Sequence, residues 1–213
     1  GKQAVLPKSA LNGGEMAVLL ETGSATIKCM DKSQPFADTD GHWAKDAVAF
    51  VSSHALFQGV EDDRFQADAP MNRAMLVTVL HRLESTPEAG SASFDDVPSD
   101  SYYAAAAAWA AGQGIVTGDG TGFAGERDVT REEMAVMLYR YVQTIHGSQG
   151  TQGSYDGMTG ADAVSDWAAP AMRWAVGSGI LRGDETGNLN PGGTATRGQV
   201  AQMLMNFVQL ITK

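Results

Sequence analysis

TREEMA at residues 130–135 is the stretch of sequence that decides the fold. It is typical of a helix start. The Thr130 hydroxyl can accept a hydrogen bond from the N–H of Glu133, and the Glu133 carboxylate can accept one from the N–H of Thr130. The same pattern returns at Thr196, and Asn72 caps a third start without the reciprocal acid. After each start, apolar residues recur on one helical face. The sequence therefore predicts three amphipathic helices, whose apolar faces can bury one another in a central bundle.

Around each helix start, an aromatic residue, a glycine and an arginine stand at nearly constant spacing. The aromatic precedes the glycine by sixteen residues, and the glycine precedes the arginine by thirteen or fourteen. The three sets are Trp43, Gly59 and Arg73; Tyr102, Gly118 and Arg131; and Trp167, Gly183 and Arg197. A fixed period indicates a repeat protein, in which one unit cannot bury its apolar face alone. Each unit is predicted to be a helix, a Gly-rich loop and a second helix, which makes the fold class mainly α.

The repeats divide the chain into an N-terminal segment, three repeats and two linkers. In chain order the boundaries are 1–34, then repeat 35–84, linker 85–93, repeat 94–145, linker 146–163 and repeat 164–213. The N-terminal segment does not match the repeat, and we expect a β-hairpin there, with strands at 16–20 and 25–30, at the end of an upstream domain. The second linker is rich in Gly and Ser, so we expect it to be mobile.

These features resemble the S-layer homology (SLH) domains of bacterial surface proteins. The resemblance rests on Phe36 and Asp38 before His42-Trp43-Ala44, on GIVTG at 114–118 before Phe123, and on TREEMA, and it covers about residues 35–210. It implies three repeats in a pseudo-threefold arrangement around a central three-helix bundle. It also implies non-covalent anchoring to the cell wall, through pyruvylated secondary cell-wall polysaccharide bound in grooves between repeats.

The grooves are not expected to be equivalent, because several positions depart from the family pattern. Repeat two has Tyr102 where the family has tryptophan, repeat one has NRAM at 72–75, and repeat three has Gly198-Gln199 in place of Ala-Glu. We therefore expect the three grooves to bind unequally.

The three arginines are the principal candidates for contacting an acidic sugar. Each occupies the first helical position, where the helix dipole makes a cation unfavourable by ~0.3–1 kcal/mol. A guanidinium beside free backbone N–H groups can bind a carboxylate, and the resemblance supplies one in the pyruvate ketal. The alternative is structural, namely inter-repeat salt bridges to Asp38, Asp96 and Asp166.

The other repeated residues have a structural and a binding interpretation each. Trp43, Tyr102 and Trp167 could pack in the core or stack on a sugar ring. Gly59, Gly118 and Gly183 could serve as turn residues or let a ligand approach the backbone. Asp38, Asp96 and Asp166 could cap the first helix of each repeat or contact the ligand. A second set of aromatics, Phe50, Trp109 and Trp174, is assigned to packing.

Composition argues against several other classes of function. The net charge of −10, without a basic stripe, argues against nucleic acid, and it requires any anionic partner to meet local cationic pockets. No apolar run approaches the ~20 residues of a membrane span. The single Cys29 and four scattered histidines indicate no metal site. We expect no cofactor and no enzyme.

Two alternatives to a polysaccharide anchor remain open at the level of sequence. The same grooves could hold an acidic peptide or a second copy of the chain, which would make this a protein-interaction or surface-layer self-assembly module. The chain could also be a fragment of a wall-remodelling enzyme.

Overall fold

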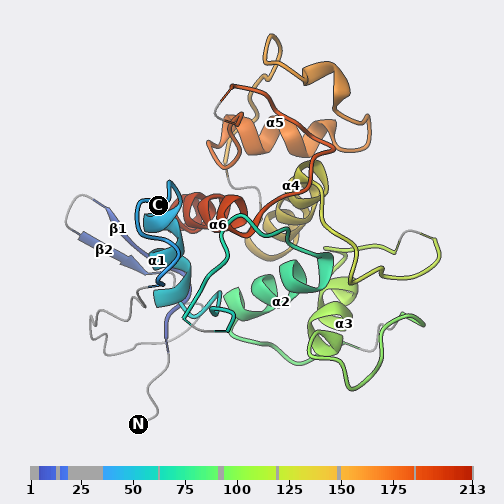
Figure 1. The fold of residues 1–213 in the computed structure, drawn as a ribbon. Coiled ribbons are helices and arrows are strands. Elements are labelled where there is room, and N and C mark those ends of the chain that lie inside the picture. The colour runs from blue at the N-terminus through green and yellow to red at the C-terminus, as the bar shows by residue number, and fades with distance from the viewer. Residues whose placement is uncertain are drawn as a thin grey trace. The chain divides into compact units, whose positions relative to one another are not determined.

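The computed structural model describes residues 5–12, 15–18, 36–61, 63–90, 94–118, 120–147, 150–184 and 186–212. Within these ranges the protein is mainly helical, as predicted (Figure 1). The helices are α1 (Lys45–Ser53), α2 (Arg73–Leu83), α3 (Ala104–Gly112), α4 (Arg131–Tyr141), α5 (Ala169–Gly177) and α6 (Arg197–Ile211). Two short elements, a π-helix at Val142–His146 and a 3-10 helix at Ala161–Ala163, flank the second linker. The three helix–loop–helix repeats are therefore confirmed.

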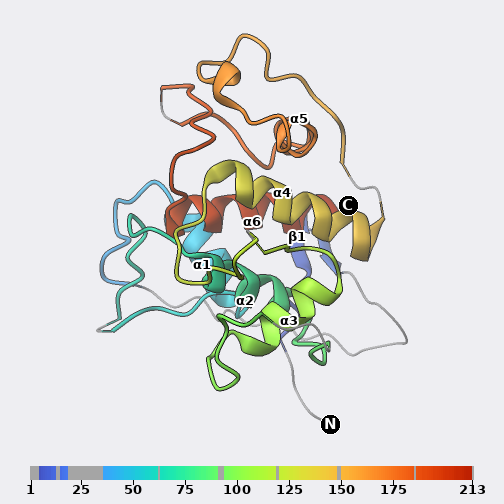
Figure 2. The ribbon, with the colours of Figure 1, turned by 90° about the vertical axis from the view of Figure 1, so that its right-hand side faces the viewer.

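The chain forms two compact units. One comprises residues 1–69 and 197–213, and the other comprises residues 70–196. In the first unit α1 packs against α6, and in the second α2 packs against α3 and α4 against α5 (Figures 1 and 2). The second helix of each repeat thus covers the first helix of another repeat, and α6 returns to the first repeat. This exchange is how units that cannot bury their own apolar faces obtain a core.

Side-chain caps start two of the second helices as predicted. Thr130 Oγ1 accepts from Glu133 N at 3.2 Å, and the Glu133 carboxylate accepts from Thr130 N at 3.0 Å, which completes the capping box of α4. Asn72 caps α2 alone, by accepting from Met75 N at 2.8 Å. The box predicted at Thr196 stays a prediction. These caps satisfy N–H groups that a helix cannot satisfy within itself.

The apolar stripes of α2, α4 and α6 are buried, as their periodicity predicts. Of the residues assigned to packing, Trp109 and Trp174 are 4% and 2% exposed, which confirms their assignment. Phe50 is half-buried and stacks on His54 with ring centroids 4.0 Å apart. Among the described residues, none of the helices combines the length and apolar character needed to cross a membrane.

The N-terminal hairpin pairs differently from the prediction. β1 (Ser9–Asn12) and β2 (Glu15–Val18) are antiparallel, with Ser9 opposite Val18. The predicted strand at 16–20 is therefore a strand as far as Val18, but its partner lies upstream, on the far side of Gly13-Gly14, a two-residue hairpin signal that the prediction overlooked. The strand expected at 25–30 lies outside the described residues. β1 contacts α6, and His54 Nε2 lies 2.9 Å from Ser9 O, so the hairpin is part of the first unit.

The second linker packs on α5 from residue 150 onward, instead of running free. Thr151 Oγ1 donates to Gly177 O at 2.8 Å, and Gly153 N donates to Arg173 O at 3.0 Å. Tyr155 is only 6% exposed. Gly153 and Gly177 permit this contact, because a Cβ on either would collide with the backbone of the other. From residue 150 onward, two of the linker and helix glycines, Gly153 and Gly177, thus serve close backbone packing.

Candidate functional site: an inter-repeat groove

The three repeat arginines are buried and hold loops of neighbouring repeats. Arg73, Arg131 and Arg197 are 5%, 5% and 7% exposed. Each donates from Nε to the carbonyl of a buried apolar residue, and from Nη2 to the carbonyl just before the repeat glycine. The acceptors are Phe123 O (2.9 Å) and Thr117 O (3.2 Å) for Arg73, Leu189 O (2.9 Å) and Arg182 O (2.8 Å) for Arg131, and Phe65 O (2.8 Å) and Gln58 O (3.0 Å) for Arg197.

This geometry differs from both interpretations of the arginines. The hydrogen bonds described above end on backbone carbonyls rather than on Asp38, Asp96 or Asp166, and the guanidinium groups are buried instead of extending into solvent as ligand arms. Charge-assisted hydrogen bonds to carbonyls offset the unfavourable position at the start of a helix. Burial lowers the pKa of Arg197 and the charge of Asp38 opposes that shift, so the two groups interact through space without an ion pair.

Asp38 and Asp96 bind the same loops from the opposite side. Asp38 accepts from Phe65 N at 2.8 Å and Gln66 N at 2.7 Å, and Asp96 accepts from Phe123 N and Ala124 N, both at 2.7 Å. Desolvation raises the pKa of Asp38, but the N–H groups of Phe65, Gln66 and Asp38 itself, with the charge of Arg64, outweigh it and hold the pKa below its usual value. The prediction that these aspartates cap the first helices is wrong, because α1 and α3 have no side-chain cap.

Asp166 is not the structural counterpart of Asp38 and Asp96. It is exposed and does not cap α5. In repeat three, Leu189 N donates to Thr159 O at 2.9 Å and Asn190 N to Asn188 Oδ1 at 2.9 Å, so other groups take the place of the aspartate. Grouping Asp166 with the other two aspartates was wrong. Asp166 directly precedes Trp167, whereas Asp38 and Asp96 stand five and six residues before their aromatics.

The three first aromatics are on the surface. Trp43, Tyr102 and Trp167 are 60%, 64% and 57% exposed. The core interpretation is therefore wrong for them, and the structure leaves all three ring systems available for stacking. The repeated glycines, in contrast, are explained by packing, because a side chain would not fit at these positions. A Cβ on Gly118 would lie 2.6 Å from the backbone of Gly122, and one on Gly183 would lie 2.5 Å from the backbone of Gly187. A Cβ on Gly59 would collide with the Phe36 ring. They permit close packing, and none has the positive φ of a glycine-specific turn.

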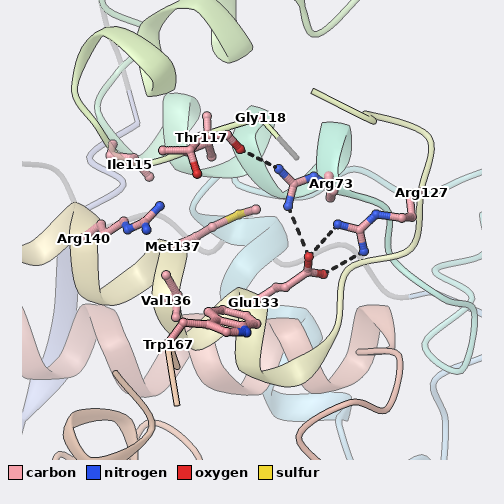
Figure 3. A pocket seen from close by; sticks show the side chains of 11 residues that line it. Arg73, Ile115, Thr117, Gly118, Arg127, Glu133, Val136, Met137, Arg140 and Trp167 are labelled. Atoms are coloured by element: carbon pink, nitrogen blue, oxygen red, sulfur yellow. Dashed lines mark hydrogen bonds and ion pairs between the residues drawn. The ribbon is translucent and has the colours of Figure 1, made fainter. Parts of the chain in front are cut away.

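A pocket of about 140 Å³ lies within the second unit and joins three repeats (Figure 3). We call it the α4 groove. Its lining residues are Arg73 from α2, residues 115–118, Arg127, four residues of α4 (Glu133, Val136, Met137 and Arg140) and Trp167. One predicted arginine, one predicted glycine and one predicted aromatic thus come together, each from a different repeat.

The α4 groove is cationic although the chain is acidic. Among its described lining residues, three guanidinium groups face one carboxylate, a formal charge of +2 in a chain of −10. Glu133 accepts from Arg127 Nη1 at 3.0 Å, and its Oε1 lies 3.5 Å from Arg73 Nη1. Burial raises the pKa of Glu133, but the hydrogen bonds from Arg127 and from Thr130 N, with the charges of both arginines, hold it below its usual value. The Glu133 carboxylate therefore stays ionised at neutral pH and fixes the positions of the Arg73 and Arg127 guanidinium groups.

Arg127 and Arg140 were missed by sequence reasoning, and Glu133 was identified only as a cap. A signal was present for α4, because residues 133, 136, 137 and 140 have the i, i+3, i+4, i+7 spacing of one helical face. Among the described residues no cluster of three or more His, Cys, Asp or Glu could hold a metal ion.

Three segments match the S-layer homology domain, at residues 35–74, 93–135 and 161–201, which together exceed half of the chain. The chain belongs to the S-layer homology domain family. Relatives include the exoglucanase XynX of Acetivibrio thermocellus (28% identical over 192 residues, 90% of this chain and 18% of the relative). They also include an amylopullulanase of Thermoanaerobacterium thermosulfurigenes (29% over 177 residues, 82% and 9%) and the surface-layer 125 kDa protein of Lysinibacillus sphaericus (28% over 171 residues, 78% and 14%).

The chain spans less than a fifth of the length of each of these relatives. The matches cover 78–90% of this chain and therefore include most of its SLH segments. The family and these relatives support anchoring at the bacterial cell surface.

Proposed function

We propose that this chain anchors a surface protein to the cell wall by binding pyruvylated secondary cell-wall polysaccharide in its inter-repeat grooves. The observation that supports this most directly is the α4 groove, a cationic pocket beside an exposed tryptophan in a chain of net charge −10. A pyruvate ketal supplies a carboxylate for the arginines, and the sugar ring supplies a face for Trp167. The arginines and Trp167 line the same pocket.

The charge distribution favours a local anion site over diffuse attraction. At a distance, the acidic chain repels an anionic polymer, and this repulsion is screened beyond ~10 Å at 0.1 M salt. Inside the groove the guanidinium groups lie close to the ligand and are partly shielded from water, so their attraction is screened less. The anchor is thereby selective for polymers whose charges can enter the groove.

The proposed role requires no chemical step. The hydrolase names of the relatives describe whole proteins, of which this chain matches a small part. The proposal is therefore a non-catalytic binding function, with Trp43, Tyr102 and Trp167 as stacking platforms. The buried arginines, Asp38, Asp96 and the glycines shape the loops that form the groove walls.

Purified cell walls test the proposal. The protein should sediment with intact walls, and should stay in the supernatant with walls from which the ketals, or the whole polysaccharide, have been removed. Trp167→Ala should weaken sedimentation, while Trp43→Ala in the same assay reports on a second exposed platform. Undiminished binding to stripped walls that retain only protein partners would contradict the proposal and favour the protein-interaction function.

A further inference from the structure

Arg140 differs from the other cations of the α4 groove in what it contacts. Arg73 uses Nε and Nη2 for loop carbonyls and places Nη1 3.5 Å from Glu133. Arg127 uses both terminal nitrogens on the Glu133 carboxylate. Arg140 is half-buried, and within the described part of the chain it makes no hydrogen bond or ion pair.

The position of Arg140 separates it from the Glu133 cluster. Figure 3 shows Arg140 at one end of the groove and Arg127 at the other, with Met137 and the Glu133 side chain between them. Glu133 pairs with both Arg73 and Arg127, so its single charge offsets only one of theirs, while the guanidinium of Arg140 has its donors available to an incoming group. A planar guanidinium is suited to a carboxylate in bidentate geometry.

We infer that Arg140, rather than the buried Arg73, is the residue that contacts the carboxylate of the ligand and sets the preference for an acidic sugar. This inference rests on the proposed function of the groove. Arg73 has a positioning role, because it holds the carbonyls of Thr117 and Phe123 and so fixes the opposite wall. The repeated arginine and the ligand-contacting arginine are thus different residues.

The same helical position distinguishes the three repeats. Arg140 stands nine residues after the first residue of α4, and the equivalents are Arg82 on α2 and Asn206 on α6. Arg82 is half-buried near Tyr102; burial lowers its pKa, and the interaction with Tyr102 opposes that shift. Asn206 carries no charge and accepts from Gln202 Nε2 at 3.0 Å. The side chain at this position is therefore a cation on α2 and α4 and is uncharged on α6.

Calorimetric titration of the whole chain with a terminal pyruvylated amino sugar, and with the same sugar lacking the ketal, tests this inference. Arg140→Ala should weaken binding of the pyruvylated sugar about tenfold or more. Arg140→Lys should retain part of the affinity, and the matched variant Asn206→Ala should bind like the wild type. Binding of the unmodified sugar should be the same in all four proteins.

Three outcomes would overturn the inference. They are unchanged binding in Arg140→Ala, an equal loss for both sugars, which would indicate a merely structural role, and a loss in Asn206→Ala as large as in Arg140→Ala. Thermal unfolding of each variant verifies that it is folded. A wild-type chain that does not bind the pyruvylated sugar would instead refute the proposed function, and the inference with it.

Discussion

Phe65 illustrates how single residues build the walls of the grooves. Its N–H donates to Asp38 and its carbonyl accepts from Arg197. Two charged side chains that are far apart in the sequence thus fix the backbone of one residue. Phe123 is held in the same way by Asp96 and Arg73. The period of the sequence identified the repeated arginines, but it could not identify their partners, because hydrogen bonds to a backbone carbonyl leave no trace in residue type. The arginine is repeated because each loop needs it.

Replacing Arg131 by alanine should lower the free energy of unfolding by about 2–4 kcal/mol. The substitution removes two charge-assisted hydrogen bonds and leaves the carbonyl of the buried Leu189 without this donor. Denaturant unfolding measures the loss. Arg64→Ala, at an exposed arginine, is the control and should change stability by less than about 0.5 kcal/mol. Equal stability of the two variants would contradict the role assigned to the arginine.

Acidification should destabilise the protein partly through Glu133. Its pKa is lower in the folded protein than in the unfolded chain, so the unfolded state binds more protons as the pH falls. The stabilisation is complete above the ordinary glutamate pKa of about 4.3 and is lost as the pH falls through the lower folded value. Unfolding free energies measured from pH 7 to pH 3 should decline less steeply for Glu133→Gln than for the wild type. Parallel declines would refute this.

Helices and loops show which elements local sequence can predict. The capping box at Thr130 and the apolar periodicity placed the second helices correctly, because both signals lie within one element. The exchange of helices between repeats, with α4 on α5 and α6 on α1, depends on contacts between distant segments and has no local signal. The predicted hairpin pairing was wrong because the Gly13-Gly14 turn signal was overlooked, and the second linker packs on α5 where we expected mobility. Glycines were interpreted as turn or mobility signals, whereas Gly153 and Gly177 permit one backbone to pack on another.

Gly177→Ala tests that interpretation of the linker. A Cβ at Gly177 would overlap the backbone of residues 151–153, so we expect a loss of about 1–3 kcal/mol. The amide of Gly153, which donates to Arg173 O, should lose protection in hydrogen exchange. Gly112→Ala is the matched control, since Gly112 ends α3 as Gly177 ends α5 and a Cβ there meets nothing within 4 Å. Similar effects of the two substitutions would contradict close packing by the linker.

At the scale of the whole molecule, an acidic chain carries a small cationic groove. The sequence predicted local cationic pockets from the net charge, and the repeats located Arg73, Gly118 and Trp167 on the walls of one such groove. Arg127 and Arg140 could not be predicted as part of this groove, because neither belongs to the repeated set of aromatic, glycine and arginine. Their role follows only from the fold, which places α4 opposite the loop held by Arg73.

The opposing charges of chain and groove predict an unusual response to salt. Most binders of anionic polymers lose affinity steeply as salt rises, since their attraction is long-range. Here the long-range term is repulsive, so raising salt from about 0.02 M to 0.15 M should speed association with the polysaccharide. Surface plasmon resonance on immobilised wall polysaccharide measures the rate. A decline by tenfold or more over this range would show that a diffuse positive surface dominates binding instead.

A structure of the chain with a terminal pyruvylated amino sugar is the most direct test of the central claim. We predict that the sugar occupies the α4 groove, with its carboxylate against Arg140 and its ring face on Trp167. A sugar bound elsewhere while the α4 groove stays empty, at concentrations that saturate binding in solution, would contradict the account.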